Sequence, residues 1–127
     1  MLENFTLIAA SVGIIALIFA YFMAAKINKV SVGTERMKEI SGYIQDGAMA
    51  FLKREYKALF IFVIVLFVVI WIGLKSLPTA LAFLLGALCS TAAGYAGMSV
   101  ATKANVRTAN AAMESGMNKA LSVAFSG

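Results

Sequence analysis

The sequence predicts an all-α membrane protein, and three observations support this prediction. Of its 127 residues, 61% are hydrophobic and 13% are charged, and the mean hydropathy is +0.88. A soluble domain has about 45–50% apolar and about 25% charged residues. Three stretches without charge are long enough to cross a bilayer, and the basic residues gather on one side of them. We therefore expect three transmembrane helices and the start of a fourth, all within one membrane domain (1–127).

The first expected span covers residues 5–25. A hydrocarbon core of ~30 Å needs about 20 helical residues, which this stretch supplies. A secretory signal peptide would place positive charge before a shorter apolar core, whereas the only charge before this stretch is Glu3. We expect the first span to be retained in the protein.

One long helix is expected from about residue 34 to residue 74. Thr34 can cap its start, and Glu35 suits the positive end of the helix dipole. Apolar residues spaced three to four apart predict an amphipathic cytoplasmic extension over residues 34–57. The second span follows at 58–74, where bulky apolar side chains on every face indicate a peripheral, lipid-facing helix.

The third expected span covers residues 78–101 and follows a turn short enough to require an antiparallel hairpin. Pro78 is tolerated in the first turn of a helix. Small residues recur along the span and let helix backbones approach closely. The predicted packing positions are Gly86, Ser90, Gly94 and Gly97. Small residues can also be tolerated without a close neighbour, and this alternative stays open.

After the third span, Gly116 is expected to end a helix and Asn118 to restart one. An apolar run follows from Ala120, so a next span is predicted to begin near residue 118. The sequence stops within this run. The rows of small residues on the third span also have too few matching neighbours among the other spans. These two observations predict that the chain is a fragment of a larger protein.

Basic residues predict the orientation in the membrane. The segment 26–57 holds seven Lys or Arg residues and the segment after residue 102 holds three, whereas Lys75 stands alone on the other side. By the positive-inside rule, the N-terminus lies outside, and the loop 26–57 and the C-terminal tail are cytoplasmic. This distribution accounts for the net charge of +5, so the charge does not indicate nucleic-acid binding. The sequence also has no basic stripe with interleaved aromatic residues, which a nucleic-acid-binding surface would show.

The sequence offers no catalytic, cofactor-binding or metal-binding residues of its own. None of its six carboxylates lies in a predicted span, so no proton relay is expected. Glu35 and Glu39, one turn apart, could hold a hydrated Mg²⁺, but Arg36 and Lys38 beside them favour a solvated face of mixed charge. Cys89 is the single cysteine and there is no histidine.

One charged cluster lies where the long helix is expected to enter the membrane. It consists of Lys53, Arg54, Glu55, Tyr56 and Lys57. Basic side chains can extend to the headgroups, and tyrosine suits the interface, so the cluster is predicted to be a membrane-edge anchor. The alternative is that Lys53 or Arg54 draws an anionic substrate toward a cytoplasmic site.

Three stretches resemble the N-terminal part of the membrane-bound, ion-translocating inorganic pyrophosphatases. They are GTERMKEISGYIQDGAMAFLKREYKALF (33–60), FLLGALCSTAAGYAGMSVATKANVRTANAA (83–112) and GMNKALSVAFSG (116–127). The most specific pieces are GAMAFLKREYK and NVRTANAA.

The resemblance implies a multi-pass protein of about sixteen helices per subunit, which forms a homodimer in the cell membrane. It implies hydrolysis of inorganic pyrophosphate at a cytoplasmic Mg²⁺ site, coupled to outward transport of H⁺ or Na⁺, with a K⁺ requirement in some members. The acid-rich motifs of the family lie on later helices, so this chain is expected to bind none of these ions and to be inactive without the remaining helices. The alternative is a small non-catalytic membrane scaffold or a subunit of a larger complex.

Overall fold

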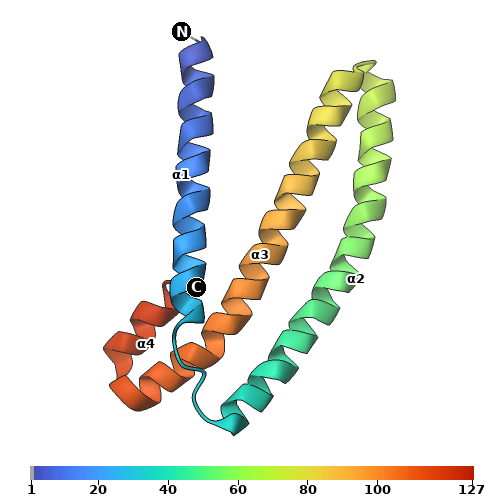
Figure 1. The fold of residues 1–127 in the computed structure, drawn as a ribbon. Helices are drawn as coiled ribbons and strands as arrows, with labels where there is room; N and C mark the ends of the chain where they lie inside the picture. The colour runs from blue at the N-terminus through green and yellow to red at the C-terminus, as the bar shows by residue number, and fades with distance from the viewer. Residues whose placement is uncertain (1) are drawn as a thin grey trace. The chain divides into compact units, whose positions relative to one another are not determined.

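The computed structural model describes residues 2–127, with side chains from residue 6 onward. This part of the chain contains four helices and no strand: α1 (Leu2–Asn28), α2 (Glu35–Leu74), α3 (Leu77–Ser115) and α4 (Met117–Ala124) (Figure 1). Three are long and apolar enough to cross a membrane, over Thr6–Asn28, Glu35–Leu74 and Leu77–Ser115. The predicted all-α membrane fold is confirmed.

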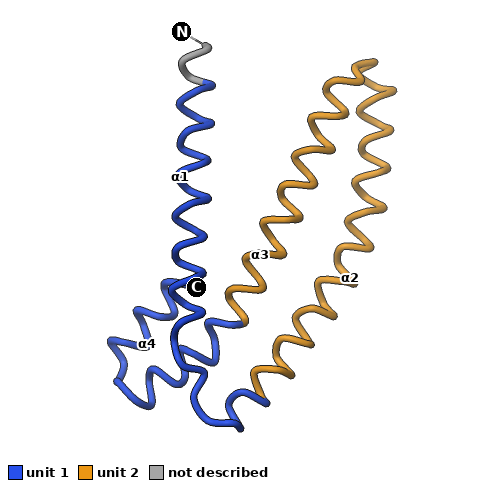
Figure 2. Tube along the Cα trace, viewed as in Figure 1, with its two compact units in different colours: residues 1–39, 103–127 blue, residues 40–102 orange. Residues whose placement is uncertain are grey.

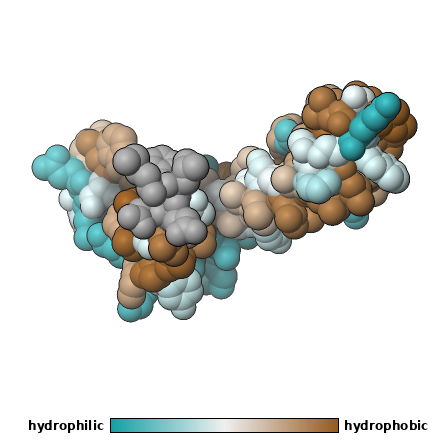
Figure 3. All heavy atoms as spheres, turned by 90° about the horizontal axis from the view of Figure 1, so that it is seen from above, coloured by the Kyte–Doolittle hydropathy of each residue, from teal (hydrophilic) through white to brown (hydrophobic). Residues whose placement is uncertain are grey.

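The helices divide into two compact units (Figure 2). The first consists of Met1–Glu39 and Lys103–Gly127, and the second of Ile40–Thr102. The long helices α2 and α3 each contribute residues to both. Many large hydrophobic side chains of the long helices are exposed, and patches of hydrophobic residues are visible from above in Figure 3. Such a surface is expected of helices that lie in lipid or against further helices.

The second unit is an antiparallel hairpin made by α2 and α3. Lys75 and Ser76 form the whole connection, and Lys75 has a positive φ of 49°. The Ser76 and Thr79 hydroxyls share a hydrogen bond of 2.8 Å, and the Ala80 N–H donates to the Ser76 carbonyl. Ala80 is completely buried at this end of the hairpin. The predicted hairpin is therefore present.

The start of α2 agrees with the predicted cap. The N–H of Met37 donates to Thr34 Oγ1 at 3.3 Å, and the N–H of Lys38 donates to the Thr34 carbonyl at 3.0 Å. These bonds satisfy donors that the first turn of a helix leaves unpaired. From there α2 continues without a break to Leu74, which places the charged cluster and the apolar run on one rigid element.

The first unit packs the end of α1, the loop 29–34, the end of α3 and α4 around a small core. Ala111, Ala120 and Val123 form this core, and Val30 of the loop packs against it. The helix α3 continues beyond residue 101 to Ser115, because no Gly or Pro lies between residue 101 and Gly116. Gly116, with φ of 80°, separates α3 from α4 and confirms the predicted stop. A fourth span beginning near residue 118 stays a prediction.

Candidate functional site

The loop between α1 and α2 is held by two side chains of α3. Arg107 Nε donates to the Val30 carbonyl at 3.0 Å, while its Nη1 donates to the Lys103 carbonyl at 2.7 Å. Asn110 is 1% exposed, and its Nδ2 donates to the Ser31 carbonyl in a long bond of 3.5 Å. Two successive loop carbonyls, which no regular secondary structure would satisfy, thus find their donors on α3.

Gly33 completes this loop clamp, which we define as Val30, Ser31, Gly33, Arg107 and Asn110. Its φ of +87° is a conformation that residues with a Cβ rarely adopt. A Cβ there would also overlap with Asn110 Oδ1. The Gly33 N–H donates to Ser31 Oγ at 3.2 Å. Asn110 Oδ1 is buried and has no hydrogen-bond partner in the described part of the chain.

The clamp gives the NVRTANAA stretch a structural role that sequence reasoning did not find. Arg107 and Asn110 lie three residues apart on one face of α3. Their partners are backbone carbonyls 77 and 79 residues earlier. Every residue has a backbone carbonyl, so the residue types at positions 30 and 31 do not reveal that these carbonyls accept hydrogen bonds. The sequence therefore shows the two donor side chains but not their partners.

The predicted membrane-edge cluster lies on α2 in the second unit. Lys53, Arg54, Glu55 and Lys57 are exposed, and none of the four forms an ion pair within residues 6–127. Tyr56 differs from them, because it is half-buried and its hydroxyl donates to the Thr91 carbonyl of α3 at 3.0 Å. Tyr56 therefore joins the two helices of the hairpin, a contact that was not predicted. The anchor role of the cluster stays a prediction.

The four predicted packing positions on α3 differ in what lies beside them. A Cβ on Gly94 would lie 3.4 Å from Tyr56 Oη, whereas a Cβ on Gly86 or Gly97 would have no heavy atom within 4 Å among the described residues. Ser90 is exposed. Gly94 thus lies close to α2, and the other three positions remain available to a neighbour that residues 6–127 do not provide.

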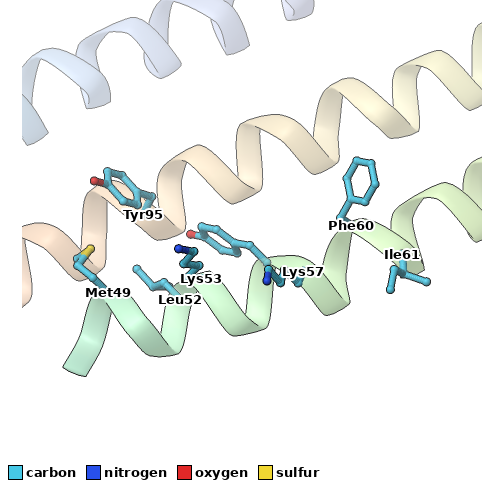
Figure 4. Close-up of a pocket in the computed structure, with 8 residues that line it drawn as sticks. Met49, Leu52, Lys53, Lys57, Phe60, Ile61 and Tyr95 are labelled. Atoms are coloured by element: carbon cyan, nitrogen blue, oxygen red, sulfur yellow. The ribbon is translucent and has the colours of Figure 1, made fainter. Parts of the chain in front are cut away.

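A groove runs along α2 beside Tyr56 (Figure 4). Its volume is about 650 Å³, and it is lined by Met49, Leu52, Lys53, Tyr56, Lys57, Phe60, Ile61 and Tyr95. A second cavity of about 200 Å³ shares Tyr56 and Phe60 with it and is otherwise lined by Leu59, Val63, Leu88 and Thr91. Tyr56 and Phe60 are thus common to both hollows.

The carboxylates of α2 are arranged as a solvated surface. Arg36 Nη1 and Glu39 Oε2 form an exposed ion pair of 2.7 Å, in keeping with the predicted face of mixed charge. Within residues 6–127 there is no group of three or more His, Cys, Asp or Glu side chains that could hold a metal ion. These residues do not fit a magnesium site by themselves, and no reaction step is assigned to a metal bound by them.

The long apolar helices define a multi-pass membrane protein. Among the described polar side chains, Tyr56 joins α2 to α3, and Arg107 and Asn110 hold the loop between α1 and α2. The model of the family described as inorganic H⁺ pyrophosphatase matches residues 14–127. The chain belongs to this family, as the resemblance of its three stretches predicted.

Relatives with described activities match nearly the whole chain. A protein of Clostridium tetani, provisionally named a K⁺-stimulated pyrophosphate-energized sodium pump, is 53% identical over 99% of the chain and 18% of its own length. A K⁺-insensitive pyrophosphate-energized proton pump of Methanosarcina mazei is 42% identical over 99% of the chain and 19% of its own length. A K⁺-stimulated pyrophosphate-energized sodium pump of Thermotoga maritima is 46% identical over 90% of the chain and 16% of its own length. The chain spans about one fifth of these relatives.

Proposed function

We propose that this chain is the N-terminal part of a membrane pyrophosphatase, which couples hydrolysis of inorganic pyrophosphate to outward transport of H⁺ or Na⁺. The match of the family model to residues 14–127 carries the proposal. Its relatives are named for pumping either sodium ions or protons. Pyrophosphate-driven ion transport is what these names share, and the transported ion is left to experiment.

The ions and partners of the complete enzyme follow from the same source. The names of the relatives state K⁺ stimulation in some proteins and K⁺ insensitivity in others, which supports K⁺ as a candidate activator. Mg²⁺ is the expected cofactor, since metal ions neutralise and position the oxygens of a transferring phosphoryl group. The homodimer is proposed from the family resemblance.

Residues 1–127 would contribute structure to this enzyme. The hairpin of α2 and α3 supplies two membrane-crossing elements, and the loop clamp connects α1 to α2 in a defined conformation. We assign pyrophosphate binding and ion transport to helices beyond residue 127, so the chain by itself is expected to be inactive.

Membrane vesicles test this proposal. The protein is expressed from its complete reading frame, and inverted vesicles are supplied with pyrophosphate and Mg²⁺, with and without K⁺. We expect phosphate release together with acidification of the lumen or uptake of Na⁺. Vesicles that contain residues 1–127 alone should release phosphate only at the background rate.

Two results would contradict the proposal. Phosphate release by residues 1–127 alone would place the catalytic groups within this chain. A complete protein that is stable in the membrane but releases no phosphate from pyrophosphate would favour the non-catalytic scaffold, which the family match does not favour.

A further inference from the structure

The groove along α2 carries two lysines in an otherwise largely apolar lining. Lys53 and Lys57 lie one helical turn apart near its middle, with Met49 and Leu52 on one side of them and Phe60 and Ile61 on the other, toward the predicted membrane span (Figure 4). Tyr95 of α3 lines the groove from the other helix. The two lysines therefore adjoin an apolar trough formed by Phe60 and Ile61.

The two lysines carry positive charge that the described residues do not neutralise. Neither Lys53 nor Lys57 forms an ion pair within residues 6–127. Glu55 lies two residues from each lysine, and residues at this spacing do not face each other on a helix. A ligand in this groove would meet two free ammonium groups.

The apolar trough lies at the start of the predicted span. Phe60 and Ile61 follow Lys57 by three and four residues, within the predicted span 58–74. The two lysines lie just before this span, where α2 is predicted to enter the bilayer. Their ammonium groups are therefore expected at the level of the lipid headgroups, and the trough at the edge of the hydrocarbon core.

We propose that this groove binds one anionic phospholipid of the cytoplasmic leaflet. Its phosphate would lie between Lys53 and Lys57, and an acyl chain would lie along Phe60 and Ile61. A further protein helix is a poorer occupant, because it would bury the two ammonium groups unless it also brought acidic partners. Basic pockets between transmembrane helices on the cytoplasmic side suit anionic headgroups. The proposal rests on the proposed topology and is independent of pyrophosphate hydrolysis.

Lipid retention tests the proposal. The protein, expressed from its complete reading frame, is reconstituted into vesicles of phosphatidylcholine with a minor share of phosphatidylglycerol, extracted in detergent and weighed by native mass spectrometry. Lys53→Gln/Lys57→Gln removes the charge, and Ile61→Trp fills the trough without changing the charge. Lys29→Gln/Lys38→Gln is the matched control, because it removes two exposed lysines that do not line this groove.

We expect the wild type to retain phosphatidylglycerol in preference to phosphatidylcholine. Loss of both groove lysines should weaken this retention by about 25-fold, since each lysine near an anionic membrane surface contributes roughly fivefold in affinity. Ile61→Trp should also lower retention, and the control pair should retain as much lipid as the wild type.

Three results would overturn the proposal. Equal retention by the groove variants and the control would show that the lysines bind no lipid. Equal retention of the two phospholipids would show that headgroup charge is not recognised. Absence of bound lipid, together with loss of assembly in Ile61→Trp, would show that another helix or a second copy fills the groove. A protein that binds lipid but does not hydrolyse pyrophosphate would contradict the proposed function and leave this proposal standing.

Discussion

Arg107 and Asn110 hold the loop between α1 and α2 by different means. The guanidinium of Arg107 joins two carbonyls, one in the loop and one on its own helix. Asn110 is almost completely buried and fills the space that the missing side chain of Gly33 leaves. The first contact is a charge-assisted hydrogen bond, which is typically stronger than a neutral one, and the second depends on shape.

Arg107→Ala is expected to loosen the loop. A hydrogen bond from a charged group contributes about 1.5–3 kcal/mol. Its loss should therefore raise the population of the open, protease-sensitive loop by about tenfold or more. Limited trypsin digestion of the purified protein, followed at the bond after Lys29, measures this opening. Lys103→Ala is the matched control, because it removes one positive charge while the Lys103 backbone carbonyl stays in place. Unchanged cleavage in both variants would show that the loop does not depend on Arg107.

Gly33→Ala is expected to lower the free energy of unfolding by about 1–3 kcal/mol, the cost of holding a residue with a Cβ in a sparsely populated conformation. Overlap with Asn110 adds to this cost, so Gly33→Ala/Asn110→Ala should relieve part of it. Thermal unfolding in detergent measures both variants. Gly13→Ala is the control, since a Cβ there would have no atom within 4 Å among the described residues. A neutral Gly33→Ala would disprove the clamp geometry.

At the scale of elements, the helices could be predicted well and their contacts only in part. Hydropathy and the Thr34 cap located α2 to within one residue of its start in the structure. Tyr56 is predicted to lie at the headgroup level, and the structure adds a contact that the sequence does not predict, in which its hydroxyl donates to the Thr91 carbonyl. The rotation of α2 about its axis decides which side chain faces α3. The sequence does not indicate this rotation, because bulky apolar residues lie on every face of the helix.

Small residues on α3 are expected to respond differently to enlargement. Gly94→Leu should destabilise the hairpin by about 1–3 kcal/mol, because Gly94 lies against Tyr56 and overpacking costs this much. Gly86→Leu should leave the hairpin itself unchanged, because a Cβ at Gly86 has no atom within 4 Å among the described residues. It should destabilise the complete protein, where we expect another helix to pack closely against Gly86. Val65→Leu, at an exposed position on α2, should have no effect.

Size-exclusion chromatography after stepwise heating compares these three variants in the complete protein. Equal tolerance of all three would remove the argument for close packing along α3. If Gly86→Leu is tolerated and Gly94→Leu is not, close packing along α3 would be limited to the contact between Gly94 and Tyr56.

At the scale of the whole molecule, the structure leaves most apolar side chains of the long helices exposed. This surface requires lipid or further helices, in agreement with a chain that spans about one fifth of its relatives. The class of protein and its family could be predicted from composition and from three stretches of sequence. The residues that carry the chemistry could not be predicted, because the acid-rich motifs that the resemblance implies lie on later helices.

The predicted topology can be measured with single cysteines in a Cys89→Ala background. Ser76→Cys, in the turn between α2 and α3, should react with a membrane-impermeant maleimide in intact cells. Lys38→Cys, near the start of α2, should react only after the membrane is permeabilised, because the basic segment 26–57 is expected inside. The reverse pattern would invert the proposed orientation, and with it the leaflet from which lipid enters the groove.

The two-residue turn at Lys75 and Ser76 has a consequence for how the hairpin tolerates insertions. Tyr56 and Gly94 lie at equal distances from Lys75, nineteen residues before it and nineteen after it. One residue inserted between Tyr56 and the turn would rotate Tyr56 by about 100° about the axis of α2 and move it by about 1.5 Å along it. The tyrosine would then point away from α3, and so short a turn has no slack to absorb the change. The two helices are thus locked in rotational phase, and length changes in α2 between Tyr56 and the turn should not be tolerated.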